Sequence, residues 1–317
     1  MDRIEFSKIR SNLNRAVKFK KCLHPQQENC SKKVIKAHSI QNNRILNKLS
    51  KDGYVLHVDI SDLKFTQDLS KIGKKIATTF EGFCDTHDKV FTPIEAKDYD
   101  PTNVEQNFFF AYRIFCREYI VKNQAYELIE ETNREFGENN DLISMLEGYK
   151  HSFKDLKYYK LVFDKALMEK DYDKIGTKVI ELSNVFSIAV CSGFGIEFDF
   201  KGNRLNELSN FDERLRYLFL TIFPQNNSTY CLLSYLKEDE EFFALILEQL
   251  GNMGEEMKIQ KLNILIVEYC ENFVYSPEQW GKIPREDKAE FLNLFQEIFA
   301  EKKPSTMIRK PKFNLFC

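Results

Sequence analysis

The sequence is poor in the features that mark several large protein classes. It has only 12 Gly and 8 Pro in 317 residues, which excludes a collagen-like or low-complexity chain. Its longest apolar stretches, such as Phe242–Leu247 and Leu262–Val267, are much shorter than the ~20 residues of a membrane-spanning helix. The first ten residues lack the apolar core of a signal peptide. We therefore expect a cytoplasmic protein with no membrane partner and with reduced thiols.

Several enzyme signatures are also missing. We find no phosphate-binding loop, no serine-nucleophile elbow and no dinucleotide fingerprint. The glycine-bearing stretch at 193–203 lacks the Gly-x-Gly-x-x-Gly spacing and is typical of a strand with turns. At 43% hydrophobic and 14% aromatic residues, the chain can bury a sizeable core, which excludes general disorder. The length is enough for about two domains.

Charge is distributed unevenly along the chain. Residues 1–80 hold 17 Lys and Arg against 7 Asp and Glu, a net charge of +10. The rest holds 29 basic and 41 acidic residues, a net charge of -12. A basic segment of this kind indicates a polyanionic partner. Pro93 and Pro101 bracket an acidic spacer, so we predict a basic module at 1–100 and an acidic body at 101–317, with a possible further boundary near 183.

Periodicity predicts an α+β protein that is mostly helical. We expect a small N-terminal zinc-binding, treble-clef-like module, then a helical region, then a small antiparallel sheet with C-terminal helices. The aromatic residues at 108–115, together with Arg113, lie within a helical pattern, so core packing is favoured over base stacking. The predicted helices are 2–20, 40–49, 103–136, 141–169, 173–182, 238–250, 258–274 and 285–301, and the predicted strands are 54–60, 76–84, 187–191, 196–200, 217–223 and 229–235, the last two forming a hairpin.

Four possible zinc ligands occur in two pairs about fifty residues apart. Cys22 and Cys30 flank a turn-like segment, and Cys84 and His87 have the Cys-x2-His spacing that places two ligands on one turn. Four nitrogen and sulfur ligands are what tetrahedral structural Zn²⁺ requires. The first pair is loosely spaced, so His24 can replace either cysteine. The alternative is a set of buried free cysteines with a hydrogen-bonded histidine.

The segment AHSIQ, which contains His38 and follows the cysteine pair, precedes a Cys-x2-His segment with an apolar lead-in. This combination, over residues 20–95, resembles the treble-clef HNH endonuclease module of restriction and phage-defence proteins. By position, His38 matches the general base of that family, and Cys84 and His87 match its Cys and first His. The final metal-binding His of the family corresponds to Asp88 here, and its Asn falls near Thr79.

The resemblance implies phosphodiester hydrolysis in which His38 deprotonates water. Asp88, with Glu95, would hold a catalytic Mg²⁺ or Mn²⁺, since carboxylate oxygens suit hard cations. The alternative is a zinc-stabilised nucleic-acid- or protein-binding component without catalysis, in which His38 caps a turn or binds zinc itself.

The expected partner is nucleic acid, DNA rather than RNA, with the acidic body as a possible surface for a protein partner or a homo-oligomer. Clustered lysines and arginines neutralise phosphates without reading sequence. The residues predicted to contact nucleic acid are Lys32, Lys33, Lys36, Arg44, Lys74 and Lys75.

Overall fold

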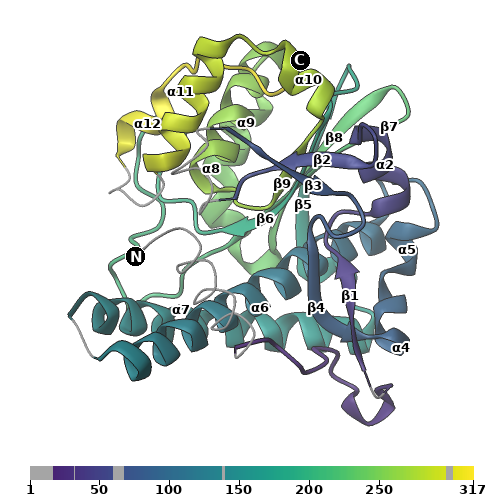
Figure 1. Cartoon of the computed structure of the whole chain (residues 1–317), viewed down its shortest axis with the longest axis vertical. Coiled ribbons are helices and arrows are strands. Elements are labelled where there is room, and N and C mark those ends of the chain that lie inside the picture. Colours follow the sequence, from purple (N-terminus) through teal and green to yellow (C-terminus); the bar gives the residue numbers. More distant parts are fainter. Residues whose placement is uncertain (1–16, 32, 60–67, 138–139, 298–302) are drawn as a thin grey trace.

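Seven strands form one antiparallel sheet through the middle of the molecule (Figure 1). They belong to a computed structural model that describes residues 17–31, 33–59, 68–137, 140–297 and 303–317. Strands that are far apart in sequence are neighbours, because β2 pairs with β9 and β9 pairs with β6. The order across the sheet is β3 (Ser70–Gly73), β2 (Tyr54–His57), β9 (Phe273–Tyr275), β6 (Ile188–Phe194), β7 (Leu218–Gln225), β8 (Ser228–Leu236) and β5 (Ile175–Leu182).

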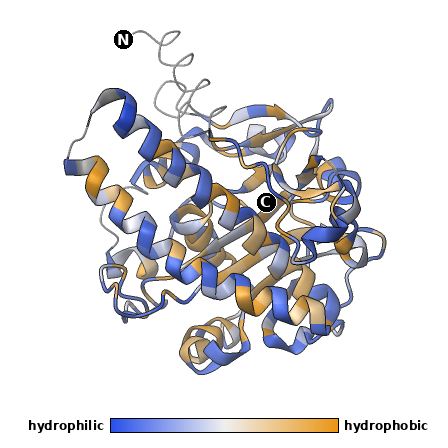
Figure 2. Cartoon of the chain, turned by 90° about the horizontal axis from the view of Figure 1, so that it is seen from below, coloured by the Kyte–Doolittle hydropathy of each residue, from blue (hydrophilic) through white to orange (hydrophobic). Residues whose placement is uncertain are grey.

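Both faces of this sheet are buried, and alternate side chains enter two different cores. In β7, Leu220 and Ile222 join one hydrophobic cluster, whereas Phe219 and Phe223 join the other. Helices cover each face (Figure 1), and Figure 2 shows hydrophilic residues along the outer sides of the two longest helices. One face carries α8 (Glu240–Gly251), α9 (Glu255–Tyr269), α10 (Pro277–Lys282), α11 (Arg285–Gln296) and α12 (Pro304–Ile308), and the other carries α6 (Val104–Phe136) and α7 (Asn140–Glu169).

The N-terminal part packs on the α6 side. Strands β1 (Val34–His38) and β4 (Thr79–Cys84) form a separate two-stranded antiparallel sheet, followed by α4 (Asp85–Asp88) and α5 (Thr92–Glu95). Gly82 permits a close approach to α6, because a Cβ there would lie 2.4 Å from Cδ1 of Ile120. Residues on both sides of the boundary predicted near residue 100 therefore share one core, and β2 and β3 belong to the main sheet. The division of the chain into two domains near residue 100 remains a prediction.

The α+β class and most of the predicted helices agree with the structure, but several predictions were wrong. The run predicted as a strand at 196–200 forms none, and Phe198 makes only an isolated bridge to Arg204. The helix predicted at 2–20 lies mostly outside the described residues. The segment predicted as helix 173–182 forms β5, where Thr177, Val179 and Ile180 suit a strand and all eight residues pair with β8. The helix predicted to end at 274 ends at Tyr269, and Phe273–Tyr275 forms β9. The sheet predicted to be small has seven strands, and the chain is less helical than expected. Within the described ranges, no helix has the length and apolar character needed to cross a membrane.

Candidate metal centre and adjoining cavity

Three cysteines and one histidine converge at the N-terminal end of the molecule. The ligand atoms of Cys22, Cys30, Cys84 and His87 all lie within 4.8 Å of one another. Nδ1 of His87 lies 3.5 Å from Sγ of Cys22 and 3.4 Å from Sγ of both Cys30 and Cys84. Tetrahedral zinc, with bonds of about 2.3 Å to sulfur and 2.0–2.1 Å to nitrogen, requires a nitrogen–sulfur separation of about 3.6 Å. The Cys₃His group is therefore positioned to hold a metal ion.

Local backbone structure positions each of these ligands. Cys22 and Cys30 flank η1 (Gln27–Asn29), a single 3₁₀ turn. The side chain of Gln27 donates to the Cys22 carbonyl at 2.6 Å, and the backbone N–H of Cys30 donates to the Gln27 carbonyl at 3.2 Å. Cys84 ends β4, and His87 lies one helical turn later in α4. A β-strand that runs directly into a helix thus places the second ligand pair beside the first.

The pKa values of two thiols in the cluster are shifted in opposite directions. Burial and the neighbouring thiols of Cys22 and Cys84 raise the pKa of Cys30 to about 12. Burial also opposes ionisation of Cys84, but hydrogen bonds from Ser31 and the His87 backbone outweigh it and lower the Cys84 pKa to about 6. Three adjacent thiolates repel one another unless a cation lies between them. The donor set therefore fits a soft or borderline divalent metal better than a metal-free cluster.

His24 is not part of this cluster, although its position in the sequence left that open. Its ring stacks on His87 with centroids 3.9 Å apart, and its Nδ1 accepts a hydrogen bond from the Gln26 backbone at 3.2 Å. Burial, followed by the proximity of His87 and Lys160, lowers the His24 pKa to about 4, so the ring is neutral near pH 7. His24 supports a ligand and leaves the four-residue set to the three cysteines and His87.

A separate open cavity of about 440 Å³ collects the three predicted catalytic residues. His38 comes from the end of β1, Asp88 from the end of α4 and Glu95 from the end of α5. Lys36, Gln41 and Asn42 complete the polar part of the lining. Because His87 and Asp88 are adjacent, the metal cluster and this cavity are connected through α4. His38 lies in the cavity and outside the cysteine cluster, so the geometry does not make it a ligand there.

His38 has the form of a neutral base. Its Nε2 lies 3.3 Å from the carbonyl oxygen of Lys74, and a carbonyl can only accept, so Nε2 carries the hydrogen. The unprotonated nitrogen of the neutral ring is then Nδ1. Burial lowers the pKa of His38. The hydrogen bond to the Lys74 carbonyl opposes this effect, and the nearby Arg113 cation adds to it. Thr79 is the cross-strand partner of His38 in the β1–β4 ladder.

Arg113 is the main residue of this site that sequence reasoning did not assign to it. Its side chain, only 4% exposed, reaches from α6 and donates through Nη2 to Oε1 of Glu95 at 2.6 Å. Its Nε is buried without a hydrogen-bond partner in the described structure, and the guanidinium lies 4.4 Å above the Phe91 ring. In the sequence, the only sign of this position was an arginine among aromatic residues in a helical pattern. The acidic body thus supplies a buried cation to the cavity of the basic module.

The backbone beside His38 is strained and tightly bonded. Thr78 has a φ of 57°, in the left-handed region that a β-branched residue disfavours. Its carbonyl accepts from both the backbone N–H and the hydroxyl of Ser39 at 3.0 Å. Asn272, directly before β9, donates to the Ser39 hydroxyl at 3.0 Å. These bonds hold Ser39, the residue after His38, and attach it to Asn272 at the start of a main-sheet strand.

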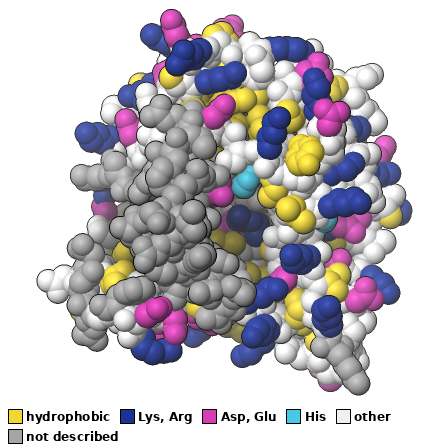
Figure 3. Space-filling view, in the orientation of Figure 1, with side chains coloured by type: hydrophobic (Ala, Val, Ile, Leu, Met, Phe, Trp, Pro, Cys, Tyr) yellow, Lys and Arg dark blue, Asp and Glu magenta, His cyan; other side chains and the backbone are white. Residues whose placement is uncertain are grey.

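The predicted phosphate-binding residues differ in their exposure and in whether they already have a polar partner. Lys33 and Lys36 are exposed along β1 and its approach, and Lys75 is exposed in the turn before β4. The Lys74 ammonium donates to Asn47 Oδ1, and Arg44 pairs with Asp98 at 3.0 Å. Lys32 lies outside the described residues. Figure 3 shows Lys and Arg side chains over the half of this face that carries β1–β4 in Figure 1.

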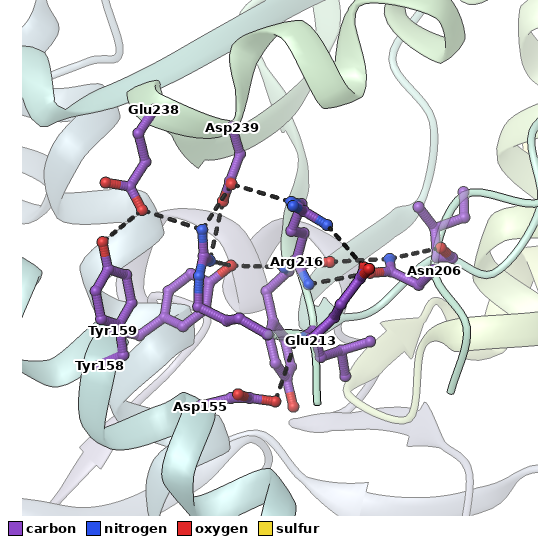
Figure 4. A network of polar contacts seen from close by, with 12 residues as sticks. Asp155, Tyr158, Tyr159, Asn206, Glu213, Arg216, Glu238 and Asp239 are labelled. Atoms are coloured by element: carbon purple, nitrogen blue, oxygen red, sulfur yellow. Dashed lines mark hydrogen bonds and ion pairs between the residues drawn. The ribbon is translucent and has the colours of Figure 1, made fainter. Parts of the chain in front are cut away.

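The body contains a second dense polar cluster (Figure 4). Arg214 donates to both carboxylate oxygens of Asp239, at 2.7 and 3.1 Å, and to Glu238 at 3.0 Å. It also donates to the hydroxyl of Tyr159 at 2.9 Å, which accepts the Tyr217 N–H at 2.7 Å. This network joins α7 to the approach to β7 and to the turn before α8, and each charge in it has a partner.

Comparison with known proteins gives no matching family model, no matching curated protein and no matching solved structure. Function must therefore be argued from the two N-terminal sites themselves.

Proposed function

We propose that this protein is a metal-dependent nuclease of the HNH-like type, with structural zinc in the Cys₃His cluster. The observation that carries the proposal is the meeting of His38, Asp88 and Glu95 in one open cavity, although 57 residue positions separate the first from the last. A strand-to-helix unit that bears a zinc cluster on one side and a base with carboxylates on the other is what a treble-clef nuclease requires. The lysines around it suit a phosphate backbone.

In this proposal, Nε2 of His38 donates its hydrogen to the Lys74 carbonyl, so Nδ1 has a free lone pair. Nδ1 then accepts a proton from the attacking water. Asp88 and Glu95 would hold Mg²⁺ or Mn²⁺, which supplies charge stabilisation to the phosphate and the leaving oxygen. Arg113 keeps Glu95 oriented through their ion pair. Lys33, Lys36 and Lys75 bind flanking phosphates, which makes double- or single-stranded nucleic acid the substrate class, DNA before RNA.

The cellular setting follows from the same chemistry. All eight cysteines are free, including the exposed Cys317. Such a chain keeps its thiols in a reducing compartment, so we place the protein in the cytoplasm. A role in defence against phage rests on the resemblance alone. The acidic body is available as a surface for a protein partner or for a second copy of the chain.

The central experiment replaces the base. His38→Ala should lower the rate of plasmid cleavage with Mg²⁺ or Mn²⁺ by about 10²–10⁴-fold, the usual contribution of a general base, with unchanged zinc content. His151→Ala is the matched control, since His151 stacks on Phe211 with centroids 4.0 Å apart, away from the cavity. Cleavage by His38→Ala at the parental rate would remove the role assigned to His38.

A second candidate is a zinc-stabilised nucleic-acid-binding component without catalysis. It is favoured by Asp88 and Thr79, which stand where the resembled family has His and Asn. This candidate predicts that the zinc-loaded parent protein cuts neither plasmid nor single strands with any divalent metal, yet binds them with steep salt dependence.

A further inference from the structure

A second cavity of about 400 Å³ adjoins the one that holds His38. Gln41 and Asn43 line both, so the two spaces lie on either side of one narrow partition. The Gln41 side chain donates to the Glu95 carbonyl at 2.7 Å and thereby joins the two segments that form the partition. The volume falls within the range of small-molecule sites, ~300–1,000 Å³. Nothing in the reaction proposed above uses this cavity.

One side of this second cavity is cationic. Arg44, Lys48 and Lys97 line it, and only Arg44 has an ion pair, with Asp98, among the residues that the structure describes. Lys48 and Lys97 are exposed at the rim. The cavity thus carries an excess of positive charge immediately beside the predicted phosphate-cleaving site.

The other side is aromatic. Phe110 lines the cavity and stacks on Phe223 with ring centroids 5.1 Å apart and planes at 16°, and Tyr99 meets Phe110 edge-on at 5.6 Å. Phe110 differs from its neighbours in the aromatic run, because Phe108 and Phe109 are at most 2% exposed whereas Phe110 is only half-buried. The run that was predicted to be core therefore contributes one ring to an accessible surface.

The segment between the two cavities has an unusual backbone conformation. It contains η2 (Asn42–Leu46), a π-helix that begins four residues after His38. Single π-helical turns are rare and occur frequently at functional sites, because they displace side chains from the ordinary helical positions. Here the turn directs Asn43 and Arg44 to the cavities and buries Ile45 and Leu46.

We propose that this second cavity receives one unstacked nucleotide next to the phosphate held beside His38. Its base would stack against Phe110, and the adjoining phosphates would contact Lys48 and Lys97. The inference rests on the proposed function for the position of the scissile phosphate. It names the substrate more closely: a strand that is single, or opened at the cut, because a base within a duplex cannot enter a cavity beside its own backbone.

Binding measurements test this without relying on cleavage. Zinc-loaded His38→Ala protein, free of other divalent ions, is titrated into a fluorescent 12-nucleotide single strand and into the matching blunt duplex. We expect tighter binding to the single strand. Adding Phe110→Leu should weaken single-strand binding by about 5-fold or more, in line with the loss of one stacked base, and leave duplex binding unchanged. Phe211→Leu, at a 47% exposed aromatic residue far from the cavity, is the matched control.

A second variant guards against misfolding of the first. Lys97→Gln changes an exposed side chain and should lower both single-strand affinity and its salt slope, by about 0.7 for one phosphate; Lys201→Gln on the opposite side of the sheet should do neither. Equal single-strand affinity for Phe110→Leu and Phe211→Leu proteins would overturn the inference, as would free deoxynucleoside monophosphate competing as well as the strand. If the parent never cuts but the Phe110-dependent preference is seen, the subsite stands and the nuclease proposal falls. If the parent cuts and that preference is missing, the nuclease proposal stands and the subsite falls.

Discussion

The two dense polar clusters of the molecule differ in whether the chain supplies all of their charges. The Arg214 guanidinium donates to both carboxylate oxygens of Asp239. It also donates to a second carboxylate, that of Glu238, and to the Tyr159 hydroxyl. Around His87, three sulfur atoms lie within bonding range of one metal ion, and no cationic side chain belongs to the group. The charges of the first cluster pair with one another within the protein (Figure 4), whereas the second cluster is positioned to hold a metal ion.

This contrast shows why crowding of polar residues does not by itself identify a site. A buried ion pair with its hydrogen bonds made is a structural device that holds elements together. Three cysteines and one histidine whose ligand atoms lie within 4.8 Å of one another, or an arginine Nε buried without a hydrogen-bond partner among the described residues, are candidates for binding something from outside the chain. Each prediction below acts on one side of this comparison.

Removing the metal should have the largest effect. A Cys₃His zinc site contributes on the order of 10 kcal/mol of binding free energy that is available to folding. Cys84→Ser protein, or parent protein treated with a strong chelator, should lose about one zinc per chain and unfold at a clearly lower Tm. Metal analysis and calorimetry measure both quantities.

Cys317→Ser is the control for that experiment, since Cys317 is exposed and outside the cluster. It should keep its zinc and its Tm. A parent protein purified without any bound metal, and insensitive to chelator, would contradict the role of the cluster.

Breaking the Arg214 cluster should have an intermediate effect. Arg214→Ala leaves the Asp239 carboxylate, 4% exposed, without its main partner, and removing one member of a buried pair costs about 3–5 kcal/mol. Urea unfolding should show this loss while zinc content stays at the parental value. The double variant Arg214→Met with Asp239→Leu should recover at least half of the stability; a double variant no better than Arg214→Ala would mean that the pair is not the source of the loss.

The smallest predicted effect is a shift in pH dependence. The Arg113 cation lowers the pKa of His38, and a general base is active above its pKa and inactive below it. Arg113→Gln should therefore raise that pKa and move the acid limb of the cleavage rate to higher pH. Rates measured across the acid limb at saturating metal test this. An acid limb that stays in place, or moves to lower pH, would show that Arg113 does not act on His38.

The sequence was most informative where chemistry depends on residue type. Cysteine and histidine at ligand spacing indicated Cys22, Cys30, Cys84 and His87, which the fold brings together over about 65 positions. Helices such as α6 and α7 were also predictable, since their apolar residues repeat with helical spacing over many turns. Short segments were not. The apolar residues of Ile175–Leu182 fit both the helical and the strand period, and only pairing with β8 decides between them.

What sequence could not provide is contact between distant segments. Arg113 and Phe110 occur in one helical pattern, and nothing in that pattern tells which of them faces the cavities around Glu95 and Arg44. Similarly, β9 has three residues and follows a helix directly, too short for periodicity to detect. Its place in the sheet depends on pairing with β6 and with β2, and β2 lies more than 200 positions earlier in the chain.

That pairing of Leu56 with Tyr275 has a consequence for how the protein is made. At about 5–20 residues per second, a ribosome needs roughly 10–40 s to add the residues between the two strands. During this interval β2 and β3 have emerged without β9, and Asn272 has not yet bonded to Ser39 beside His38. The segment that carries His38 is thus fastened to the main sheet only after Asn272 has been added to the chain. The cavity around His38 therefore reaches its final form only after β9 has been made as well.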